Sequence, residues 1–307
     1  MTAACRSFFL DAGPRGQRLC VHHAAQGVVT PRAQLLLLPP FAEELNKSRR
    51  MIALAARAFA AAGFEVLVMD LLGCGDSSGD FGDATWVDWQ DDMQLAAAWL
   101  TGRAQQPDLP LWLWGVRAGA LLASPLLASQ TLAARPLHLL LWQPVTAGKL
   151  QLQQFLRLKV AADLVGGQAK GAMQALRAQL DGGEAVEVAG YQLAASLALG
   201  LEQAQLKPER RVGRVAWLET STRAEPALSP AAATAAQGWT DLGCDVQAVA
   251  VPGPSFWAAT EIEVAPALIE ASVSALLQAS RALPNVSAAP SQGRASGMDA
   301  SLNKASV

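Results

Sequence analysis

The chain has few of the residues that build a catalytic or metal centre. Only three histidines, His22, His23 and His138, occur among its 307 residues. Histidine is the usual general base and the commonest metal ligand near neutral pH. The spacing of His, Cys, Asp and Glu matches no metal site, and Gly73 and Gly75 lack the third glycine and the partner acid of a dinucleotide fingerprint. We therefore expect no metal and no cofactor.

Paired cysteines, long apolar runs and an excess of charge are also missing. Cys5, Cys20, Cys74 and Cys244 are far apart and form no Cys-x-x-Cys pair, which favours a reducing compartment. No apolar run reaches the roughly 18 residues that span a bilayer, and residues 8–10 lack the h-region of a secretory signal. The net charge of -2 argues against a nucleic-acid partner. We expect a cytoplasmic protein with no membrane span.

Apolar sequence is abundant, at 51% of the chain. A Gly-Pro turn at residues 13–16 joins two expected opening strands, 6–10 and 18–24. Beyond them, short apolar runs alternate with helical patterns, which predicts βαβ units and a parallel sheet. The expected strands are 34–38, 66–69, 111–114 and 137–142, and the expected helices are 46–62, 86–100 and 118–129.

The pattern changes at residue 145. Residues 145–206 are rich in Gln, Leu and Ala, have a helical period, and are broken at Gly166-Gly167 and Gly182-Gly183. We predict an inserted helical lid there, between a first core part at 1–144 and a second at 207–283. The second part contains strands at 214–218 and 245–251 and a last helix at 265–283, and residues 284–307 predict a disordered tail.

The stretch from Pro110 to Leu122 contains the most informative motif. It predicts a buried strand, a tight turn and a small-residue helix, with Gly115 and Gly119 bracketing the turn. This is the layout of a nucleophile elbow, Gly-x-Ser-x-Gly. The central position holds Arg117, and a guanidinium stays protonated and cannot attack a carbonyl.

Three loops resemble those of α/β-hydrolases along nearly the whole chain. Pro39-Pro40-Phe41 stands where those proteins carry His-Gly-x, residues 70–79 resemble their Asp-x-x-Gly-x-Gly-x-Ser-x-Gly loop, and residues 115–119 stand at the elbow. The resemblance implies an α/β fold: a mostly parallel central sheet of about eight strands, helices on both faces and an inserted lid.

A closer resemblance lies in two segments. Pro-Pro-Phe-Ala-Glu-Glu-Leu-Asn-Lys-Ser-Arg-Arg from Pro39, and Phe256-Trp257 followed by Glu261-Ile262, resemble the exosortase A system-associated hydrolase 2 group. That group implies a bacterial protein of the ester or thioester hydrolase type, linked to exopolysaccharide production and protein sorting.

Two of the three catalytic slots implied by the fold hold the wrong residue type. Arg117 fills the nucleophile slot, and the histidine slot, near Ser255, holds no histidine. Glu219 or Glu225 fits the acid slot. Without a base no serine is activated at neutral pH, so we expect a degenerate, pseudoenzyme-like site.

The oxyanion donors of this fold are backbone N–H groups, which here belong to Phe41 and Ala118. With the Arg117 guanidinium they form a candidate pocket for a small anionic or acyl ligand. Alternatively, Arg117 pairs with Glu43 or Glu44, because a buried guanidinium needs a partner.

Other residues near the sheet top are secondary candidates. Cys74 is an alternative nucleophile, although no histidine is placed to lower its pKa. Trp142, Gln143, Phe256 and Trp257 either line the pocket mouth or belong to the core.

Two functions therefore stay open. The first is a degenerate hydrolase of the exosortase-associated group that binds an acyl, carboxylate or sugar-phosphate ligand. The second is a non-catalytic scaffold or partner-binding protein of that system. A third, unconventional chemistry through Glu43, Glu44 or Cys74, has the least support.

Overall fold

The computed structural model describes residues 5–165, 171–207 and 212–282 of the chain. The expected tail at 284–307 and the break at Gly166-Gly167 lie outside the described residues.

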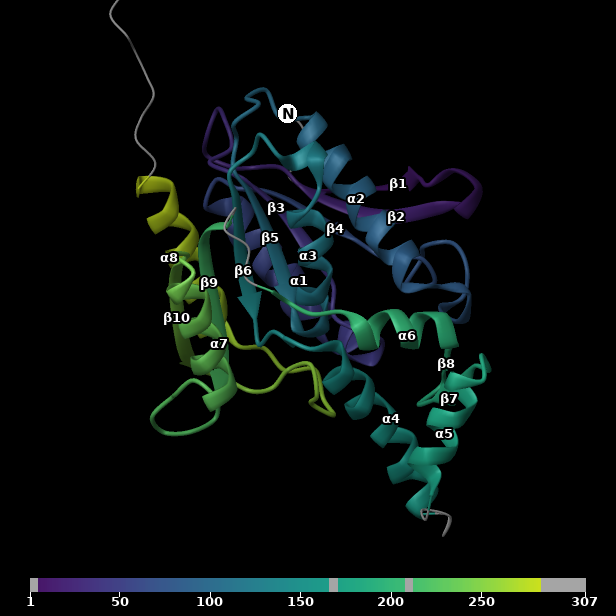
Figure 1. The fold of residues 1–307 in the computed structure, drawn as a ribbon. Helices are drawn as coiled ribbons and strands as arrows, with labels where there is room; N and C mark the ends of the chain where they lie inside the picture. The colour runs from purple at the N-terminus through teal and green to yellow at the C-terminus, as the bar shows by residue number, and fades with distance from the viewer. Residues whose placement is uncertain (1–4, 166–170, 208–211, 283–307) are drawn as a thin grey trace, which may run out of the picture.

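An eight-stranded sheet forms the centre of the molecule, in the order β1-β2-β4-β3-β5-β6-β9-β10 (Figure 1). The β1–β2 and β2–β4 pairs are antiparallel and all other pairs are parallel. The predicted mostly parallel sheet of about eight strands is confirmed. The strands are β1 (Cys5–Asp11), β2 (Gln17–His23), β3 (Gln34–Leu38), β4 (Glu65–Met69), β5 (Leu111–Val116), β6 (Leu137–Trp142), β9 (Val212–Ser221) and β10 (Asp245–Pro252).

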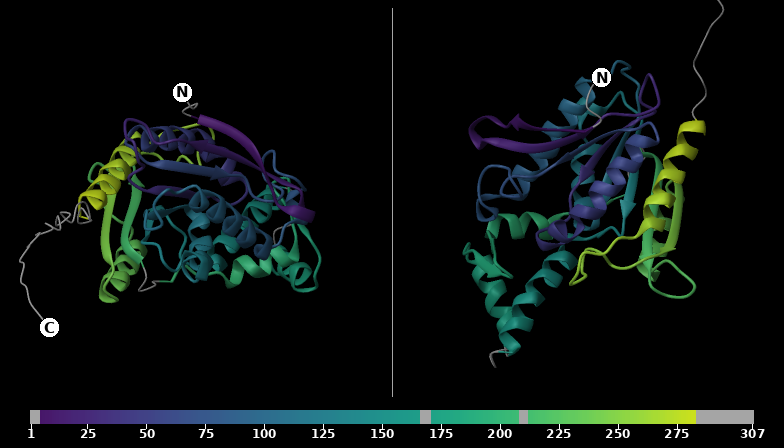
Figure 2. Two further views of the ribbon diagram at one scale, coloured as in Figure 1. Left: turned by 90° about the horizontal axis from the view of Figure 1, so that it is seen from above. Right: turned by 180° about the vertical axis from the view of Figure 1, so that it is seen from behind.

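Helices cover both faces of the sheet. Figure 2 shows α1 and α8 on one face and α2, α3 and α7 on the other. Every residue of β3, β5 and β6 is buried, which explains their continuous apolar sequences. The core helices are α1 (Glu43–Ala61), α2 (Trp86–Gly102), α3 (Ala123–Leu127), α7 (Pro230–Asp241) and α8 (Pro266–Ala282).

The helix expected at 118–129 is broken in the structure. A 3-10 helix, η3 (Arg117–Leu122), leads into the five residues of α3. Pro125 has no N–H to donate to the carbonyl four residues earlier, so it fits only the first turn of a helix. The predicted single helix is therefore wrong in this detail.

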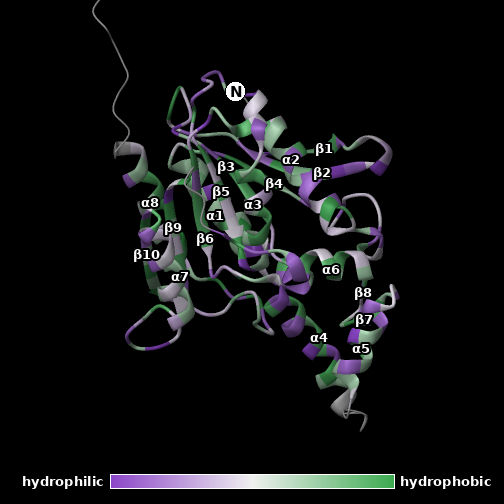
Figure 3. Ribbon diagram, in the orientation of Figure 1, coloured by the Kyte–Doolittle hydropathy of each residue, from purple (hydrophilic) through white to green (hydrophobic). Residues whose placement is uncertain are grey.

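Residues 145–165 and 171–206, which the sequence predicts as an insertion and which we call the inserted segment, lie beyond the carboxyl ends of the parallel strands (Figure 1). Its elements are α4 (Gly148–Val165), α5 (Ala172–Asp181), β7 (Val186–Val188), β8 (Tyr191–Leu193) and α6 (Ala195–Gln203). Helices α4 and α5 carry both hydrophobic and hydrophilic colours in Figure 3, as amphipathic helices do.

A small β-hairpin, β7–β8, interrupts these helices and was not expected. Ala189 and Gly190 form its two-residue turn, with φ of 52° and 84°. Positive φ at both positions is the geometry of the tightest hairpin loops. Strands of three residues leave too short a pattern for the sequence to signal them.

Candidate functional site

The turn at Arg117 has the strained backbone that is expected at the centre of the elbow motif. Arg117 has a φ of 52°, which a non-glycine residue rarely adopts. A Cβ on Gly115 would lie 2.8 Å from the Cα of Ala120, and one on Gly119 would collide with the carbonyl of Leu38. The two glycines therefore allow the sharp turn, and the strained position carries an arginine.

Parallel register brings the loops after neighbouring strands to the same edge. Leu38 pairs with Gly115, and Val116 pairs with Trp142. The Phe41 loop, Arg117 and Gln143 therefore meet at the carboxyl edge of the sheet, where ligands of open α/β sheets bind.

The Arg117 side chain is held on several sides. Its Nε and Nη2 donate to Glu44 Oε1 at 3.3 and 3.2 Å, and its Nη1 donates to the carbonyl of Gln143 at 3.1 Å. The Trp257 ring lies 4.9 Å from the guanidinium carbon, a cation–π distance. The side chain is 13% exposed. Of the two partners proposed for Arg117, Glu44 is the one in contact.

The Glu44 carboxylate is under opposing influences. Burial raises its pKa, and the Arg117 charge and the nearby Gln151 amide act in the opposite direction. Within the described part of the chain, Glu44 Oε2 and Gln151 Oε1 are buried without a hydrogen-bond partner. The pair thus neutralises charge at the elbow, and Glu44 Oε2 is its one atom without a partner among the described residues.

Glu43 makes its hydrogen bonds with groups other than Arg117. The Tyr191 hydroxyl of β8 donates to Glu43 Oε2 at 3.0 Å, and Asn46 Nδ2 contacts both groups. Glu43 therefore connects α1 to the hairpin of the inserted segment.

The two expected oxyanion donors, the N–H groups of Phe41 and Ala118, stay a prediction. Among the described residues, the Phe41 N–H has no hydrogen-bond partner. Ala118 is the second residue of η3, where a helix leaves its N–H groups without an internal acceptor. The Phe41 ring packs edge-on against Phe81, Trp89 and Phe155.

Glu219, the first candidate for the catalytic acid, stabilises the local structure. Glu219 is 5% exposed, and its carboxylate accepts hydrogen bonds from Ser229 N at 2.7 Å and Ser229 Oγ at 3.2 Å. Ser229 is the N-cap of α7, so Glu219 anchors the start of that helix. The other candidate, Glu225, is exposed.

All three histidines lie at the opposite edge of the sheet from Arg117. His22 Nε2 contacts Glu65 Oε1 at 2.8 Å, and Glu65 is the first residue of β4. His23 of β2 pairs with Val66 of β4. His138 is the second residue of β6, and burial lowers its pKa to about 4. None is placed to activate a group at the elbow.

Cys74 does not resemble an activated nucleophile. Burial raises the pKa of its thiol to about 12, and the Asp70 charge adds to the shift. A thiol of that pKa holds almost no thiolate at neutral pH.

Two of the aromatic candidates belong to the core. Trp142 is fully buried and donates from Nε1 to Ser272 Oγ at 2.8 Å, and Phe256 packs against its ring. Of the two alternatives for these side chains, the pocket mouth or the core, the core holds for both. Trp257 does reach the pocket.

A pocket of about 210 Å³ lies beside the elbow. It is built from the start of α1, from α4 and from the loop after β10. One part of its wall is aromatic or aliphatic and the other is polar. Its lining residues are Phe41, Glu43, Glu44, Lys47, Gln151, Gln154, Phe155, Leu158, Trp257 and Ala258. We call it the elbow pocket.

The α4 residues of this wall were not identified from the sequence. These residues recur at intervals of about one turn along one side of α4: Gln151, Gln154, Phe155 and Leu158. The helical period predicted the helix, but nothing in it indicates which side faces α1.

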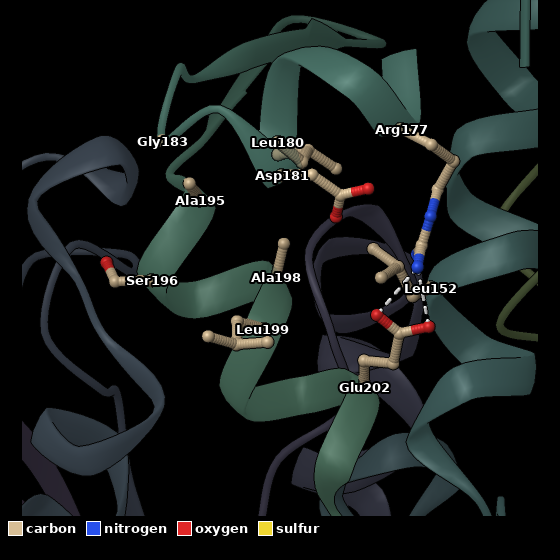
Figure 4. A pocket seen from close by; sticks show the side chains of 10 residues that line it. All are labelled: Leu152, Arg177, Leu180, Asp181, Gly183, Ala195, Ser196, Ala198, Leu199 and Glu202. Atoms are coloured by element: carbon tan, nitrogen blue, oxygen red, sulfur yellow. Dashed lines mark hydrogen bonds and ion pairs between the residues drawn. The ribbon is translucent and has the colours of Figure 1, made fainter. Parts of the chain in front are cut away.

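A second pocket, of about 380 Å³, lies within the inserted segment between α4, α5 and α6 (Figure 4). Its main polar feature is the bidentate pair of Arg177 Nη2 with the Glu202 carboxylate, at 2.7 and 2.8 Å. Those groups satisfy each other, so this pocket shows no unmet polar demand comparable to that at Glu44.

Within the described ranges, no group of three or more His, Cys, Asp and Glu side chains could hold a metal ion. No helix in those ranges combines the length and the hydropathy needed to cross a bilayer.

Comparison with known proteins identifies the fold. The family model described as "Serine aminopeptidase, S33" matches residues 30–176. No curated protein sequence matches the chain.

Several solved structures are similar at low identity. A soluble variant of monoglyceride lipase from Saccharomyces cerevisiae, in complex with a substrate analogue, has a TM-score of 0.57 and 12% identity, covering 91% of this chain and 96% of its own. Est1E from Butyrivibrio proteoclasticus with bound ferulic acid has a TM-score of 0.55 and 14% identity, covering 85% and 95%. An α/β serine hydrolase without a lid from Xanthomonas campestris has a TM-score of 0.50 and 19% identity, covering 92% and 97%.

Proposed function

Because the chain has the α/β-hydrolase fold, we propose that it is a degenerate hydrolase that binds a small acyl-type ligand without turning it over. The observation that carries this proposal is the pairing of Arg117, at the strained elbow position, with Glu44. A serine hydrolase needs a nucleophile there and a histidine within hydrogen-bond reach of it. Here the position holds a paired guanidinium, and Trp257 stacks on it from the loop where the histidine is expected.

Ligand binding is supported by what the site retains. The elbow turn, the placement of the Phe41 and Ala118 N–H groups and a pocket with aromatic walls all remain beside Arg117. Pockets with this mixture of apolar wall and few polar groups are the usual small-molecule sites. Glu44 neutralises Arg117, so this pair offers a free anion no net charge. Of the ligands considered from the sequence, a neutral acyl group is favoured over an anion.

The biological setting rests on the sequence resemblance. Two segments of the sequence resemble the exosortase A system-associated hydrolase 2 group, and both contribute residues to the elbow pocket. The first contributes Phe41, Glu43, Glu44 and Lys47, and the second contributes Trp257. The two segments meet at the elbow pocket, which is a reason to propose that the chain works in that system. We also propose that the inserted segment acts as a lid, because α4 forms one wall of the pocket.

A non-catalytic scaffold in the same system is the second candidate. The Arg117–Glu44 pair favours it, because a paired, mostly buried arginine also serves a purely structural purpose. Ligand binding in the elbow pocket separates the two candidates.

Turnover assays test the proposal. Purified protein and an Arg117→Ala variant are incubated with short and medium-chain p-nitrophenyl esters and acyl thioesters, with an active serine esterase as positive control. We expect neither protein to exceed buffer. Turnover by the wild type that the variant loses would show that Arg117 belongs to a working active site, and the proposal would be wrong.

A further inference from the structure

We propose that the chain has a second ligand site, for a small organic anion, in a cavity where two arginines lie beside the buried His22–Glu65 pair. The cavity has a volume of about 260 Å³ and lies at the edge of the sheet opposite Arg117, so this inference does not depend on the function proposed for the elbow pocket. We call it the arginine pocket. It is lined by the loop after β2 and by Arg6, Phe8, His22, Glu65, Trp99 and Arg103.

Strand pairing and helix packing bring the two arginines to this pair. Arg6 of β1 pairs directly with His22 of β2, so the two side chains lie on the same face with their Cβ atoms about 5 Å apart. Arg103 is the C-cap of α2, and its Nε lies 4.0 Å from Glu65 Oε1. One guanidinium therefore lies near the histidine of the pair and the other near its carboxylate.

Aromatic rings, and not hydrogen-bond acceptors, position the two guanidiniums. The Phe8 and Trp99 rings stack with their centroids 4.6 Å apart. The guanidinium carbon of Arg6 lies 5.5 Å from the Phe8 centroid, and that of Arg103 lies 4.8 Å from the Trp99 centroid. Contact with a ring face leaves the N–H groups, which lie in the guanidinium plane, able to bind an acceptor.

Those N–H groups are accessible and uncommitted. Both arginines are exposed, Arg103 to 49% in its side chain. Within the part of the chain that the structure describes, neither guanidinium donates a hydrogen bond, and the Arg103–Glu65 separation of 4.0 Å is too long for one. A ligand acceptor can therefore reach donors that the protein does not use.

The Glu65 carboxylate does not take the place of such a ligand. Its Oε1 contacts His22 Nε2 at 2.8 Å, and its Oε2 accepts from Gln34 Nε2 at 2.7 Å. Burial raises the pKa of Glu65, but the hydrogen bonds from His22 and Gln34 outweigh burial and lower it, so the carboxylate stays charged. One carboxylate beside two guanidiniums leaves a net positive charge, in a chain whose overall charge is -2. An anion is the complementary ligand.

The rest of the wall determines what the anion carries. The loop after β2 contributes small aliphatic side chains, among them Ala24, Val28, Val29 and Pro31. A volume of about 260 Å³ is slightly below the range of about 300–1,000 Å³ that is usual for drug-sized ligands. The pocket therefore fits an anionic head on a short aliphatic chain. A guanidinium binds carboxylates and phosphates alike, so the experiment includes both heads.

Matched ligands test the head group. Hexanoate, hexyl phosphate and 1-hexanol share one chain and differ only in the head, and each is titrated calorimetrically into the full-length protein near neutral pH. We expect the anions to bind at least tenfold more tightly than 1-hexanol, and more weakly as salt is added, because exposed charges are screened. If only one of the two anions binds in this way, that arm identifies the head as a carboxylate or a phosphate.

Variants place the effect at the arginines. Arg6→Gln and Arg103→Gln should each weaken anion binding at least fivefold and leave the affinity for 1-hexanol unchanged. Arg50→Gln makes the same change of charge at an exposed position of α1, outside the pocket lining, and should leave anion binding unchanged. Trp257→Ala, in the elbow pocket, should also have no effect. Circular dichroism confirms folding of each variant.

Three outcomes would overturn the inference. The first is anion binding no tighter than that of 1-hexanol, which includes no binding at all. The second is anion binding that neither Arg6→Gln nor Arg103→Gln weakens more than Arg50→Gln does. The third is anion binding that is lost in Trp257→Ala and kept in both arginine variants. That result would place the ligand in the elbow pocket and support the binding function proposed there.

Discussion

Two buried ion pairs of this molecule, Arg18–Asp92 and Arg117–Glu44, have similar chemistry and different surroundings. The side chains of Arg18 and Asp92 are both 0% exposed, with Nε and Oδ2 2.8 Å apart. Asp92 Oδ2 also accepts from Leu72 N at 2.7 Å, and Arg18 Nη1 donates to the carbonyls of Arg15 and Gln17. This pair fastens β2 and the loop after β4 to α2.

The elbow pair makes weaker and more strained contacts. Its distances are 3.2 and 3.3 Å, its side chains are 13% and 20% exposed, and Arg117 has a positive φ. Apart from Glu44, the hydrogen-bond partner of Arg117 is the Gln143 carbonyl. Gln143 also has a positive φ, of 42°. Strained backbone gathers at functional sites, whereas pairs that satisfy backbone groups hold the fold together. Unsatisfied atoms do not separate the two pairs, because Arg18 Nη2 and Asp92 Oδ1, like Glu44 Oε2, are buried without a partner in the described part of the chain. The comparison therefore assigns Arg18–Asp92 to stability and Arg117–Glu44 to the site.

The largest effect is expected from breaking the structural pair. Asp92→Ala leaves the Arg18 charge buried and unpaired and removes the acceptor of Leu72 N. We expect a loss of about 3–5 kcal/mol in the free energy of unfolding, measured by urea denaturation. Asp91→Ala is the control, because Asp91 is 54% exposed in its pair with Arg15, and it should cost at most about 1 kcal/mol. Equal losses in the two variants would contradict the assignment.

Breaking the elbow pair should cost less. Arg117→Ala leaves a buried carboxylate but relieves no backbone strain, since alanine also disfavours positive φ, and we expect a loss of about 2–3 kcal/mol. A double-mutant cycle with Glu44→Ala should give a coupling of about 1–2 kcal/mol, because each single change leaves the other charge unpaired. A coupling near zero would mean that the pair contributes nothing and that the comparison overstates it.

The elbow pair should also make stability depend on pH. Because burial raises the pKa of Glu44 above its ordinary 4.5, the folded chain binds this proton more tightly than the unfolded chain does. The contribution is full below about pH 4.5 and is lost as the pH rises through the folded-state pKa. Wild type should therefore lose stability relative to Glu44→Gln as the pH rises above about 4.5, as measured by urea unfolding at each pH.

The pH dependence of stability should become steeper in Arg117→Ala. Arg117 opposes the upward shift of the Glu44 pKa, so removing it should steepen the loss with rising pH. A loss that runs in the other direction, towards low pH, would show that the Arg117 charge outweighs burial.

Features of the structure that depend on residues close together in the chain were easier to predict from the sequence than those that depend on distant residues. The strand at 34–38 and the strand at 137–142 were predicted with the bounds that the structure shows, because buried strands in a parallel sheet have continuous apolar sequences. The bracketing glycines of the elbow were also recognisable, since their role is local. The break of the helix after the elbow was missed although Pro125 signals it.

The polar partners were harder to predict. Asp92 was not singled out from the sequence, because its partner Arg18 is 74 positions away. Gln151 was not singled out at all, because its role depends on how α4 packs on α1. Glu43 and Glu44 were equivalent by sequence, and the direction of each side chain on α1 decides which one meets Arg117 and which one meets Tyr191.

The smallest effect on stability is expected from Gln151→Leu. The substitution keeps the approximate size of the side chain and removes an amide whose Oε1 is buried without a partner. It also removes the amide that favours the charged Glu44, so we expect a change within about 1 kcal/mol. A loss of several kcal/mol in urea denaturation would show that the Gln151 amide is satisfied in solution.

The proposal that the elbow has no activated nucleophile is tested most directly by covalent labelling with an alkyl fluorophosphonate. An activated serine displaces fluoride from this reagent and gains a phosphonyl group, which intact-protein mass spectrometry detects. The account predicts no mass increase on the folded wild-type chain under conditions that fully label an active serine esterase. A stoichiometric phosphonyl adduct that disappears in Arg117→Ala would contradict it, because the elbow would then support a working active site.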